Sequence, residues 1–185
     1  MYKRQIQSNK ETKLASLNFS YNGIGPVGAN AVAAMVAVTG TLTKLSLARN
    51  KLGEEGTKAI CEALERNTTL KELDISGRLF SNIGGSAGAK NVAKMLGVNG
   101  GLMVANLLGN QLDAESAKML AEVAKQKGIS LCGIQRDQTT ADFSYRNLKP
   151  PDAVLLASDL SQAVVTGALT EVRWPSVWTT NCDLF

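Results

Sequence analysis

The chain has 185 residues, of which 44% are hydrophobic and 19% charged, and its net charge is +4. This length predicts one domain with a sizeable core. Lysines and glutamates interleave over 54–66, which indicates a solvated helix face rather than a nucleic-acid-binding stripe. The absence of histidine removes the commonest general base, so we expect no enzyme, no metal site and no cofactor.

Three cysteines, Cys61, Cys132 and Cys182, stand at unrelated spacings. An odd number without a metal-binding pattern predicts free thiols in a reducing compartment. We expect Cys61 to be a small buried hydrophobe and Cys132 to face the concave side of the fold described below. No apolar run reaches the roughly 18 residues of a membrane span, and 1–12 lack the apolar region of a secretory signal. These features favour an intracellular location, most simply the cytoplasm.

Residues 1–12 are polar and predict an irregular segment, after which the chain repeats itself. Alternating apolar residues predict a strand near 15–20, and helical spacing follows over 27–38. The same sequence of features recurs 28 residues later, with a strand near 43–48 and a helix over 54–66. The residues that recur in the two copies are Leu14, Leu17, Phe19, Asn22, Gly25 and Gly28, and then Leu42, Leu45, Leu47, Asn50, Gly53 and Gly56.

A third and a fourth copy follow, with predicted strands near 71–76 and 103–108 and predicted helices over 87–97 and 114–127. In the third copy Arg78 stands where the others have an asparagine, and four extra residues enter within 79–88, part of the insertion 77–88. We therefore expect a distorted third turn and a loop that bulges from the rim. In each other copy, the asparagine side chain turns the chain by bonding neighbouring backbone groups.

Later copies are weaker. A fifth is degenerate around 129–132, a sixth has a strand near 141–144 and a helix over 151–164, and a seventh starts at Leu169. The sequence therefore predicts a polar N-terminal segment over 1–12, repeats over 13–172, and an aromatic tail or cap over 173–185. One strand–turn–helix unit cannot bury its own apolar side, so consecutive units must stack.

The pattern LxxLxLxxNxLGxxG, nearly intact over 42–56, resembles the leucine-rich repeat family, specifically its ribonuclease-inhibitor-like subclass. The resemblance implies an α/β solenoid, a short arc of a horseshoe. Its parallel sheet would line the concave side and its helices the convex side. Because helices are wider than strands, the stack must curve and present a concave binding surface.

Two glycine-rich stretches invite a nucleotide-binding interpretation, and the repeat explains the first better. Residues 23–28 satisfy GxGxxG between a strand and a helix, but the glycines recur in phase as Gly53 and Gly56. In residues 84–91, lysine does not directly follow the second glycine and no serine or threonine comes after it, as a phosphate-binding loop requires. Neither stretch predicts a nucleotide.

The leading interpretation is a non-catalytic protein-interaction module, a scaffold or accessory subunit of a larger assembly. The resemblance also leaves open a regulator of a partner enzyme, either an inhibitor or a small-GTPase activator in which Arg49 stabilises charge. Tyrosine and arginine are enriched at binding hot spots, which directs attention to the concave positions. The candidate partner-binding residues are Tyr21, Arg49, Asp74, Asn106 and Tyr145 on that surface and Trp174, Trp178 and Phe185 in the tail. The tail residues either cap the open end of the solenoid or anchor a partner.

Overall fold

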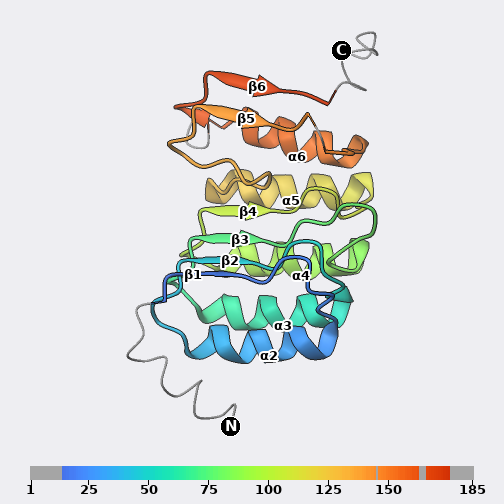
Figure 1. Cartoon of the computed structure of the whole chain (residues 1–185). Helices are drawn as coiled ribbons and strands as arrows, with labels where there is room; N and C mark the ends of the chain where they lie inside the picture. The colour runs from blue at the N-terminus through green and yellow to red at the C-terminus, as the bar shows by residue number, and fades with distance from the viewer. Residues whose placement is uncertain (1–13, 145, 163–165, 176–185) are drawn as a thin grey trace.

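The computed structural model describes residues 14–144, 146–162 and 166–175 as an alternation of short strands and helices (Figure 1). In chain order, the elements are β1 Ser16–Asn18, α2 Pro26–Val38, β2 Lys44–Ser46, α3 Gly53–Arg66, β3 Glu72–Asp74, α4 Gly85–Val98, β4 Val104–Asn106, α5 Ala114–Lys127, β5 Thr140–Asp142, α6 Pro150–Leu160 and β6 Glu171–Arg173. Every predicted strand from 15–20 to 103–108 and every predicted helix therefore has its counterpart, which confirms the repeat spacing.

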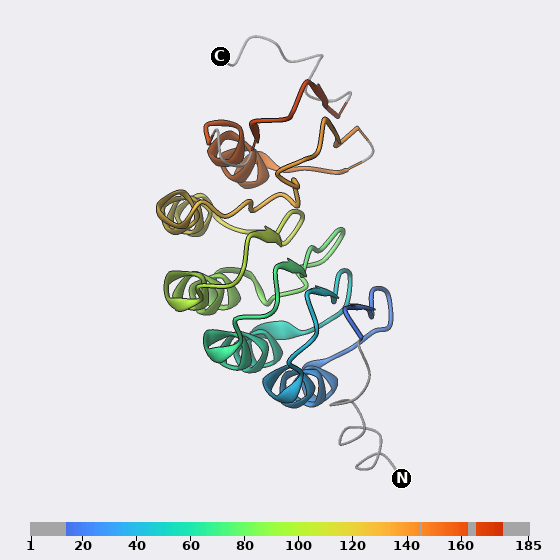
Figure 2. The same cartoon turned by 90° about the vertical axis from the view of Figure 1, so that its left-hand side faces the viewer.

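The first four strands form one parallel sheet in the order β1-β2-β3-β4. Leu17 pairs with Leu45, Leu45 with Leu73, and Leu73 with Ala105, so the strand leucines lie side by side as the 28-residue offset predicts. Figure 2 shows the strands on the inner side of an arc and the helices on its outer side. The fold is an α/β leucine-rich-repeat solenoid.

The core lies between these two layers. Strand leucines such as Leu45 and Leu47 pack with helix residues such as Ile60 and Leu64, and each of these side chains is at most 2% exposed. Burying one such side chain contributes roughly 2 kcal/mol. In the first repeat, by contrast, Leu17 and Phe19 are only half-buried, because no preceding unit among the described residues lies against them. Stacking on both sides, rather than local pattern, completes the burial.

Gly56 shows why glycine recurs at this phase. An added Cβ at Gly56 would lie 2.8 Å from the Cβ of Ala29, so the residue lets α3 pack closely on α2. This close packing is a structural reason for Gly56, and the left-handed φ of 67° is one for Gly53, so both glycines are consistent with a structural rather than a nucleotide-binding role for the matching motif at 23–28.

Buried asparagine side chains hold the turns between strands and helices. The Asn50 side chain accepts hydrogen bonds from the backbone N–H groups of Asn22 and Ile24, each at 3.0 Å. Its amide donates to the carbonyl oxygens of Phe19 and Leu47, each at 2.9 Å. One side chain thus satisfies backbone groups of two adjacent repeats, as a buried turn requires.

The third repeat corrects the sequence interpretation of Arg78. The asparagine of this repeat is Asn82, which is fully buried and donates to the carbonyl oxygens of Leu47 at 2.9 Å and Ile75 at 3.2 Å. Its own backbone N–H donates to the side chain of Asn110 at 2.8 Å. The four extra residues are therefore 78–81, and they lie before the turn asparagine rather than replacing it.

The extra residues form the predicted bulge at the rim. Arg78, Leu79 and Phe80 are all exposed, and Phe80 keeps 78% of its surface accessible. Because the inserted loop (residues 78–81) is confined to the strand-to-helix side, the strands before it and the helix after it keep their stacking. The third turn departs from the second as predicted, because Gly84 has φ of 84° where Leu52 has −55°, but the cause is the insertion and not the loss of the asparagine.

The sheet is interrupted after the fourth strand, where the sequence predicted continuous pairing. Residues 129–132 contribute only isolated bridges, Ser130 to Val104 and Cys132 to Asn106, and β5 pairs in parallel with β6 in a second sheet. The turn asparagine is absent here, and Asp159 of α6 takes over part of its task. Its carboxylate accepts hydrogen bonds from the Ser130 hydroxyl at 2.7 Å and the Cys132 N–H at 2.9 Å.

Within the described residues, no helix is long and apolar enough to cross a membrane.

Candidate partner-binding surface

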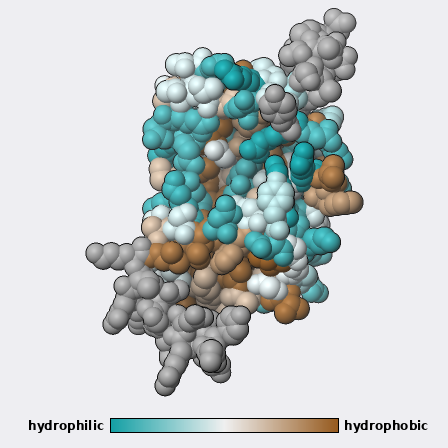
Figure 3. All heavy atoms as spheres, viewed as in Figure 1, coloured by the Kyte–Doolittle hydropathy of each residue, from teal (hydrophilic) through white to brown (hydrophobic). Residues whose placement is uncertain are grey.

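The concave face carries a row of polar side chains over the four paired strands. In a strand, residues two apart face the same side, so the first and third residues of each strand point away from the core. They line an open groove of about 420 Å³ together with Gln135 and Arg146. Figure 3 shows hydrophilic residues over much of this face and apolar residues gathered at its N-terminal end.

Charged and polar groups on the groove floor are partly paired with one another. Lys44 forms a 2.7 Å ion pair with Glu72, and the Gln135 side-chain amide donates to the other oxygen of Glu72 at 3.0 Å. Both charged side chains are partly exposed, so the pair contributes at most about 1 kcal/mol to stability. The groove therefore presents a positive and a negative side chain on two adjacent strands.

The third position of the strands forms a row of turn-making side chains. Asp74 accepts a hydrogen bond from the N–H of Ser76 at 3.0 Å, and Asn18 accepts one from the N–H of Ser20 at 2.9 Å. Such bonds to the residue two places on start the turn after a strand. Asp74 is half-buried, and one of its carboxylate oxygens makes this bond.

Asn106 occupies the same position in the fourth strand but is only 8% exposed. Its side-chain oxygen accepts a hydrogen bond from the N–H of Leu108 at 3.3 Å. It lines the groove, so its predicted role in partner contact stays a prediction. The Asn106 side chain therefore exposes less surface to a partner than its position in the repeat suggests.

Tyr21 and Arg49 occupy matching positions of the first two repeats and lie against each other. The Arg49 guanidinium carbon lies 4.7 Å from the centre of the Tyr21 ring, a cation–π arrangement. Tyr21 is 63% exposed, whereas Arg49 is half-buried. Burial lowers the pKa of Arg49, and the positive charges of Arg78 and Arg146 lower it further, while Asp74 opposes them.

Both residues adopt left-handed backbone conformations, with φ of 62° at Tyr21 and 56° at Arg49. The fourth repeat has Gly109, with φ of 73°, at this place. A residue with a Cβ costs about 1 kcal/mol there relative to glycine. The first two repeats therefore place large side chains where the backbone favours none.

The other predicted contact residues divide between described and undescribed parts of the chain. Trp174 packs near the buried ring of Phe143, with the ring centres 6.5 Å apart. This contact is what a capping role predicts, and the choice between cap and anchor stays a prediction. Tyr145, Trp178 and Phe185 lie outside the described residues.

The described cysteines are buried thiols. Burial raises the pKa of Cys61 to about 12, and the charges of Glu65 and Glu62 add to this. Cys132 is 3% exposed and belongs to the hydrophobic core, so the expectation that it faces the concave side is wrong, and its backbone N–H donates to the carboxylate of Asp159 at 2.9 Å. Burial and the neighbouring Asp159 raise the pKa of Cys132 well above its ordinary value.

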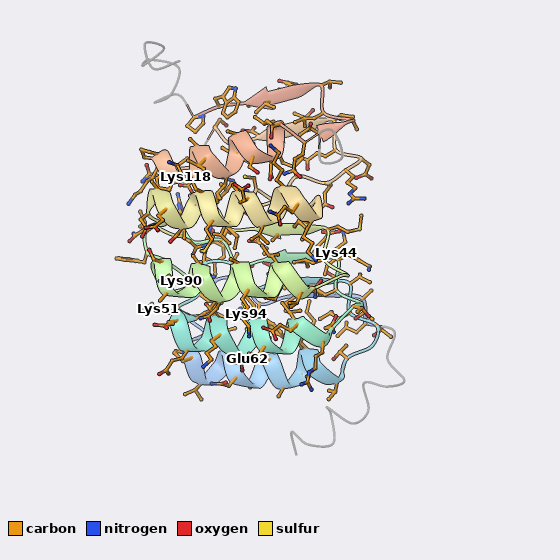
Figure 4. All side chains as sticks on the ribbon, turned by 180° about the vertical axis from the view of Figure 1, so that it is seen from behind. Lys44, Lys51, Glu62, Lys90, Lys94 and Lys118 are labelled. Atoms are coloured by element: carbon orange, nitrogen blue, oxygen red, sulfur yellow. The ribbon has the colours of Figure 1, made fainter. Side chains whose placement is uncertain are left out.

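The convex face consists of helix surfaces with mixed charge. Seen from behind, Glu62, Lys94 and Lys118 come from the helix layer, whereas Lys44 comes from the strand layer (Figure 4). Lys94 of α4 forms a 2.9 Å ion pair with Glu65 of α3. This arrangement confirms the solvated helix face predicted from the sequence. Across the described ranges, no group of three or more acidic or cysteine side chains could hold a metal ion.

Sequence reasoning did not single out several residues that shape this surface. Asp152 of α6 accepts a hydrogen bond from the N–H of Gly109 at 2.8 Å and so ties the sixth repeat to the fourth. Arg78 and Arg146 were not selected as contact residues. Arg146 follows Tyr145 as Asn22 follows Tyr21 in the first repeat. This match of repeat positions was the sequence signal that could have identified Arg146 as part of the surface.

Comparisons with known proteins agree with this fold. The family model described as Leucine Rich repeat matches residues 10–33 and 41–61. NACHT, LRR and PYD domains-containing protein 5 of Bos taurus is 30% identical over 124 residues, which make up 66% of this chain and 11% of that protein. The corresponding protein 13 of Homo sapiens is 29% identical over 123 residues, with the same shares. The chain thus spans about a ninth of the length of these relatives.

Solved structures show the same architecture at low sequence identity. The Leiomodin-1 Actin-Binding Site 2 structure superposes with a TM-score of 0.62 at 13% identity and covers 88% of each chain. The tropomodulin C-terminal domain of Caenorhabditis elegans gives 0.57 at 11% identity, covering 84% of this chain and 89% of that one. The chain carries leucine-rich repeats, a fold that suggests protein partners. The likeness to these two structures concerns the fold alone.

Proposed function

We propose that this chain is a non-catalytic protein-interaction module, which holds a protein partner against its concave face as a scaffold or accessory subunit of a larger assembly. The observation that carries the proposal is the Tyr21–Arg49 pair. Both side chains occupy backbone positions that favour glycine, and they stack on each other in the turns that follow β1 and β2. A large side chain at a left-handed backbone position, where it is not needed to fill the core, is typical of functional positions.

The proposed contact surface extends from this pair along the groove and toward the last repeat. Its members are Tyr21, Arg49, Asp74, Asn106 and Tyr145, with Trp174, Trp178 and Phe185 as a second contact at the C-terminal end. Aromatic residues and arginine contribute most to binding at protein interfaces. We further propose that the protein acts inside the cell, because the described cysteines are free buried thiols.

The test combines site-specific crosslinking with substitutions that spare the backbone. A photo-crosslinking residue replaces Ser16 or Lys44 in the groove, or Lys58 or Glu122 on the helix layer, and extracts of the source organism provide the partner. We expect one protein to crosslink from the groove positions and not from the helix positions. Because glycine fits the left-handed conformation, Tyr21→Gly with Arg49→Gly removes both side chains with little strain and should abolish that crosslink. Equal crosslinking from both faces would refute the proposal.

A second candidate is regulation of a partner enzyme, as the ribonuclease-inhibitor-like subclass suggests. The 28-residue register, seen where Ser16 pairs with Lys44 and Lys44 with Glu72, is the observation that favours this subclass. In a small-GTPase activator, Arg49 would supply positive charge to the transferring phosphoryl group. A GTPase assay with the intact chain and with Arg49→Ala tests this candidate. Stimulation that disappears with the substitution supports it, and no stimulation of any GTPase tested counts against it.

A further inference from the structure

A small pocket lies at the loops that follow β2, β3, β4 and β5, at the end of the strands to which the arrowheads point in Figure 1. Three arginines line it, each from a different repeat: Arg49, Arg78 of the inserted loop, and Arg146. The remaining lining residues are Gly77, Leu108, Gly109, Asn147 and Leu148. None of these is acidic, so the pocket concentrates positive charge from segments far apart in the sequence.

Aromatic rings hold two of these guanidinium groups without neutralising them. Arg49 lies 4.7 Å from the centre of the Tyr21 ring, and Arg146 lies 5.9 Å from the centre of the Phe143 ring. A stacked guanidinium uses its flat face, which leaves the N–H groups at its edge available for a carboxylate. Arg49 and Arg146 are thereby oriented but not neutralised.

Charge balance around the pocket is incomplete. Within the described part of the chain, the ion pairs of 4.0 Å or less involve Lys44, Lys94 and Arg173, and none of the pocket arginines. Arg78 and Arg146 both act repulsively on Arg49, and Asp74 is the carboxylate that opposes them. A site of this kind gains stability when an anionic partner arrives.

We propose that this arginine pocket, formed by Arg49, Arg78 and Arg146, receives carboxylate side chains from an acidic segment of the protein partner. The proposal rests on the protein-interaction function proposed above and states the chemistry of the partner. Leu79 and Phe80 lie next to Arg78 on the inserted loop and are 66% and 78% exposed. These two side chains favour an acidic segment that also carries apolar residues, because they can pack against its apolar side chains. A free inorganic anion would make no favourable contact with them.

The experiment measures binding of a fluorescent peptide to the full chain by anisotropy. The peptide contains pairs of glutamates separated by single leucines, and its matched control has glutamines in place of the glutamates. We expect the glutamate peptide to bind and the glutamine peptide not to bind. Binding should weaken as salt rises, because exposed charges are screened over about 10 Å at 0.1 M salt.

Substitutions identify the site. Arg78→Gln and Arg146→Gln should each weaken peptide binding roughly tenfold, the effect of one charge-assisted contact. Arg66→Gln, at the end of α3, removes the same charge from the helix layer and should leave binding unchanged. Phe80→Ser should weaken binding of the leucine-containing peptide, while inorganic phosphate at the same concentration should not compete.

Several outcomes would overturn the inference: equal binding of both peptides, equal effects of Arg66→Gln and Arg78→Gln, or competition by phosphate with no effect of Phe80→Ser. The last would assign the pocket to a small anion. Failure here is separate from failure of the proposed function. A partner that still crosslinks from Ser16 and Lys44 but ignores Arg78→Gln and Arg146→Gln refutes only the acidic segment.

Discussion

At the scale of single residues, the turn asparagines matter most because each joins two repeats. Asn82 is fully buried and bonds backbone groups of the second and third repeats. Asn50 and Asn110 do the same for their neighbours. Removing one of these side chains leaves buried backbone groups without partners, which costs more than the lost bonds would in water.

We therefore expect Asn82→Ala to lower the free energy of unfolding by about 2 to 3 kcal/mol, measured by urea denaturation. Arg78→Ala, at the position that the sequence pattern assigned to the turn, should change it by less than about 0.5 kcal/mol because its side chain is exposed. Larger destabilisation by Arg78→Ala than by Asn82→Ala would contradict the assignment of the turn residue.

The left-handed backbone at Arg49 gives a second residue-scale prediction. Arg49→Gly should keep the free energy of unfolding within about 1 kcal/mol, because relief of backbone strain offsets the lost stacking on Tyr21. Arg49→Val, which places a branched Cβ at the same φ, should destabilise by roughly 1 to 2 kcal/mol more than glycine. Thermal melts of both variants, compared with the unaltered chain, measure the difference, and equal melting temperatures would refute the strain argument.

At the scale of elements, the contact between α6 and residues 130–132 depends on a buried carboxylate. Burial raises the pKa of Asp159, although hydrogen bonds from Leu131, Ser130 and Cys132 act in the opposite direction. The folded chain therefore holds a proton on Asp159 more strongly than the unfolded chain does. Stability from this group is fully present below its ordinary pKa of 3.8 and decreases as pH rises through the raised pKa of the folded state.

This sign leads to a pH prediction for Asp159→Asn, which cannot ionise. The free energy of unfolding of the unaltered chain minus that of the variant should fall as pH rises from about 4 toward neutrality. Urea denaturation at a series of pH values measures this difference. A difference that stays constant or increases with pH would show that the hydrogen bonds to Asp159 outweigh its burial.

The inserted loop gives another element-scale prediction. Deleting residues 78–81 places Gly77 directly before Asn82, as Arg49 precedes Asn50 and Gly109 precedes Asn110. The repeat then returns to its usual spacing, so we expect far-UV circular dichroism to be unchanged and the melting temperature to shift by only a few degrees. Deleting 86–89 from α4, a cut of the same length, should destabilise the chain far more, because it removes about one helical turn together with the buried Gly88 and Ala89.

The residues named here also show how far the sequence could predict the structure. The leucine spacing gave the strand register correctly, because each repeat buries its neighbour and tolerates no slip. Arg78 was assigned wrongly because positions were counted forward from the strand. Counted back from the helix, Gly85 and Gly88 match Gly53 and Gly56, and Asn82 then falls into phase with Asn50.

Other features depend on contacts that no local pattern reports. Asp159 supports a turn 27 to 29 residues away along the chain, so its role becomes visible only once α6 is packed. The site showed the same limit. Tyr21 and Arg49 were predicted from residue type and phase, whereas the grouping of Arg49 with Arg78 and Arg146 requires three loops to meet.

At the scale of the whole molecule, burial is uneven along the stack. Leu45 and Leu73 are at most 2% exposed, but Leu17 at the same phase is only half-buried, and Val27 and Val38 of α2 are exposed. The first repeat therefore gains less from packing than the second and third. Segments with fewer buried contacts open more readily than the rest of a fold.

Hydrogen exchange measured by mass spectrometry should reveal this gradient. We expect backbone amides of α2 to exchange faster than those of α4, because α4 is covered by α3 and α5 whereas among described helices α2 is covered only by α3. Ala93→Gly in α4 lowers helix stability without moving the stack and serves as a comparison, since it should speed exchange mainly in its own helix. Equal protection of α2 and α4 in the unaltered chain would show that the first repeat is as well supported as the third.

The break between the two sheets has a mechanical consequence. Among the described residues, no backbone hydrogen bond joins 129–134 to β5, and the connection across this gap runs through the carboxylates of Asp152 and Asp159 and through packing of α6 on α5. A force that stretches the arc would be resisted by backbone hydrogen bonds between all paired strands from β1 to β4. At this junction it would be resisted only by side-chain contacts. Stretched by its two ends, the described stack should part there first, in one rupture step ahead of the four-stranded block.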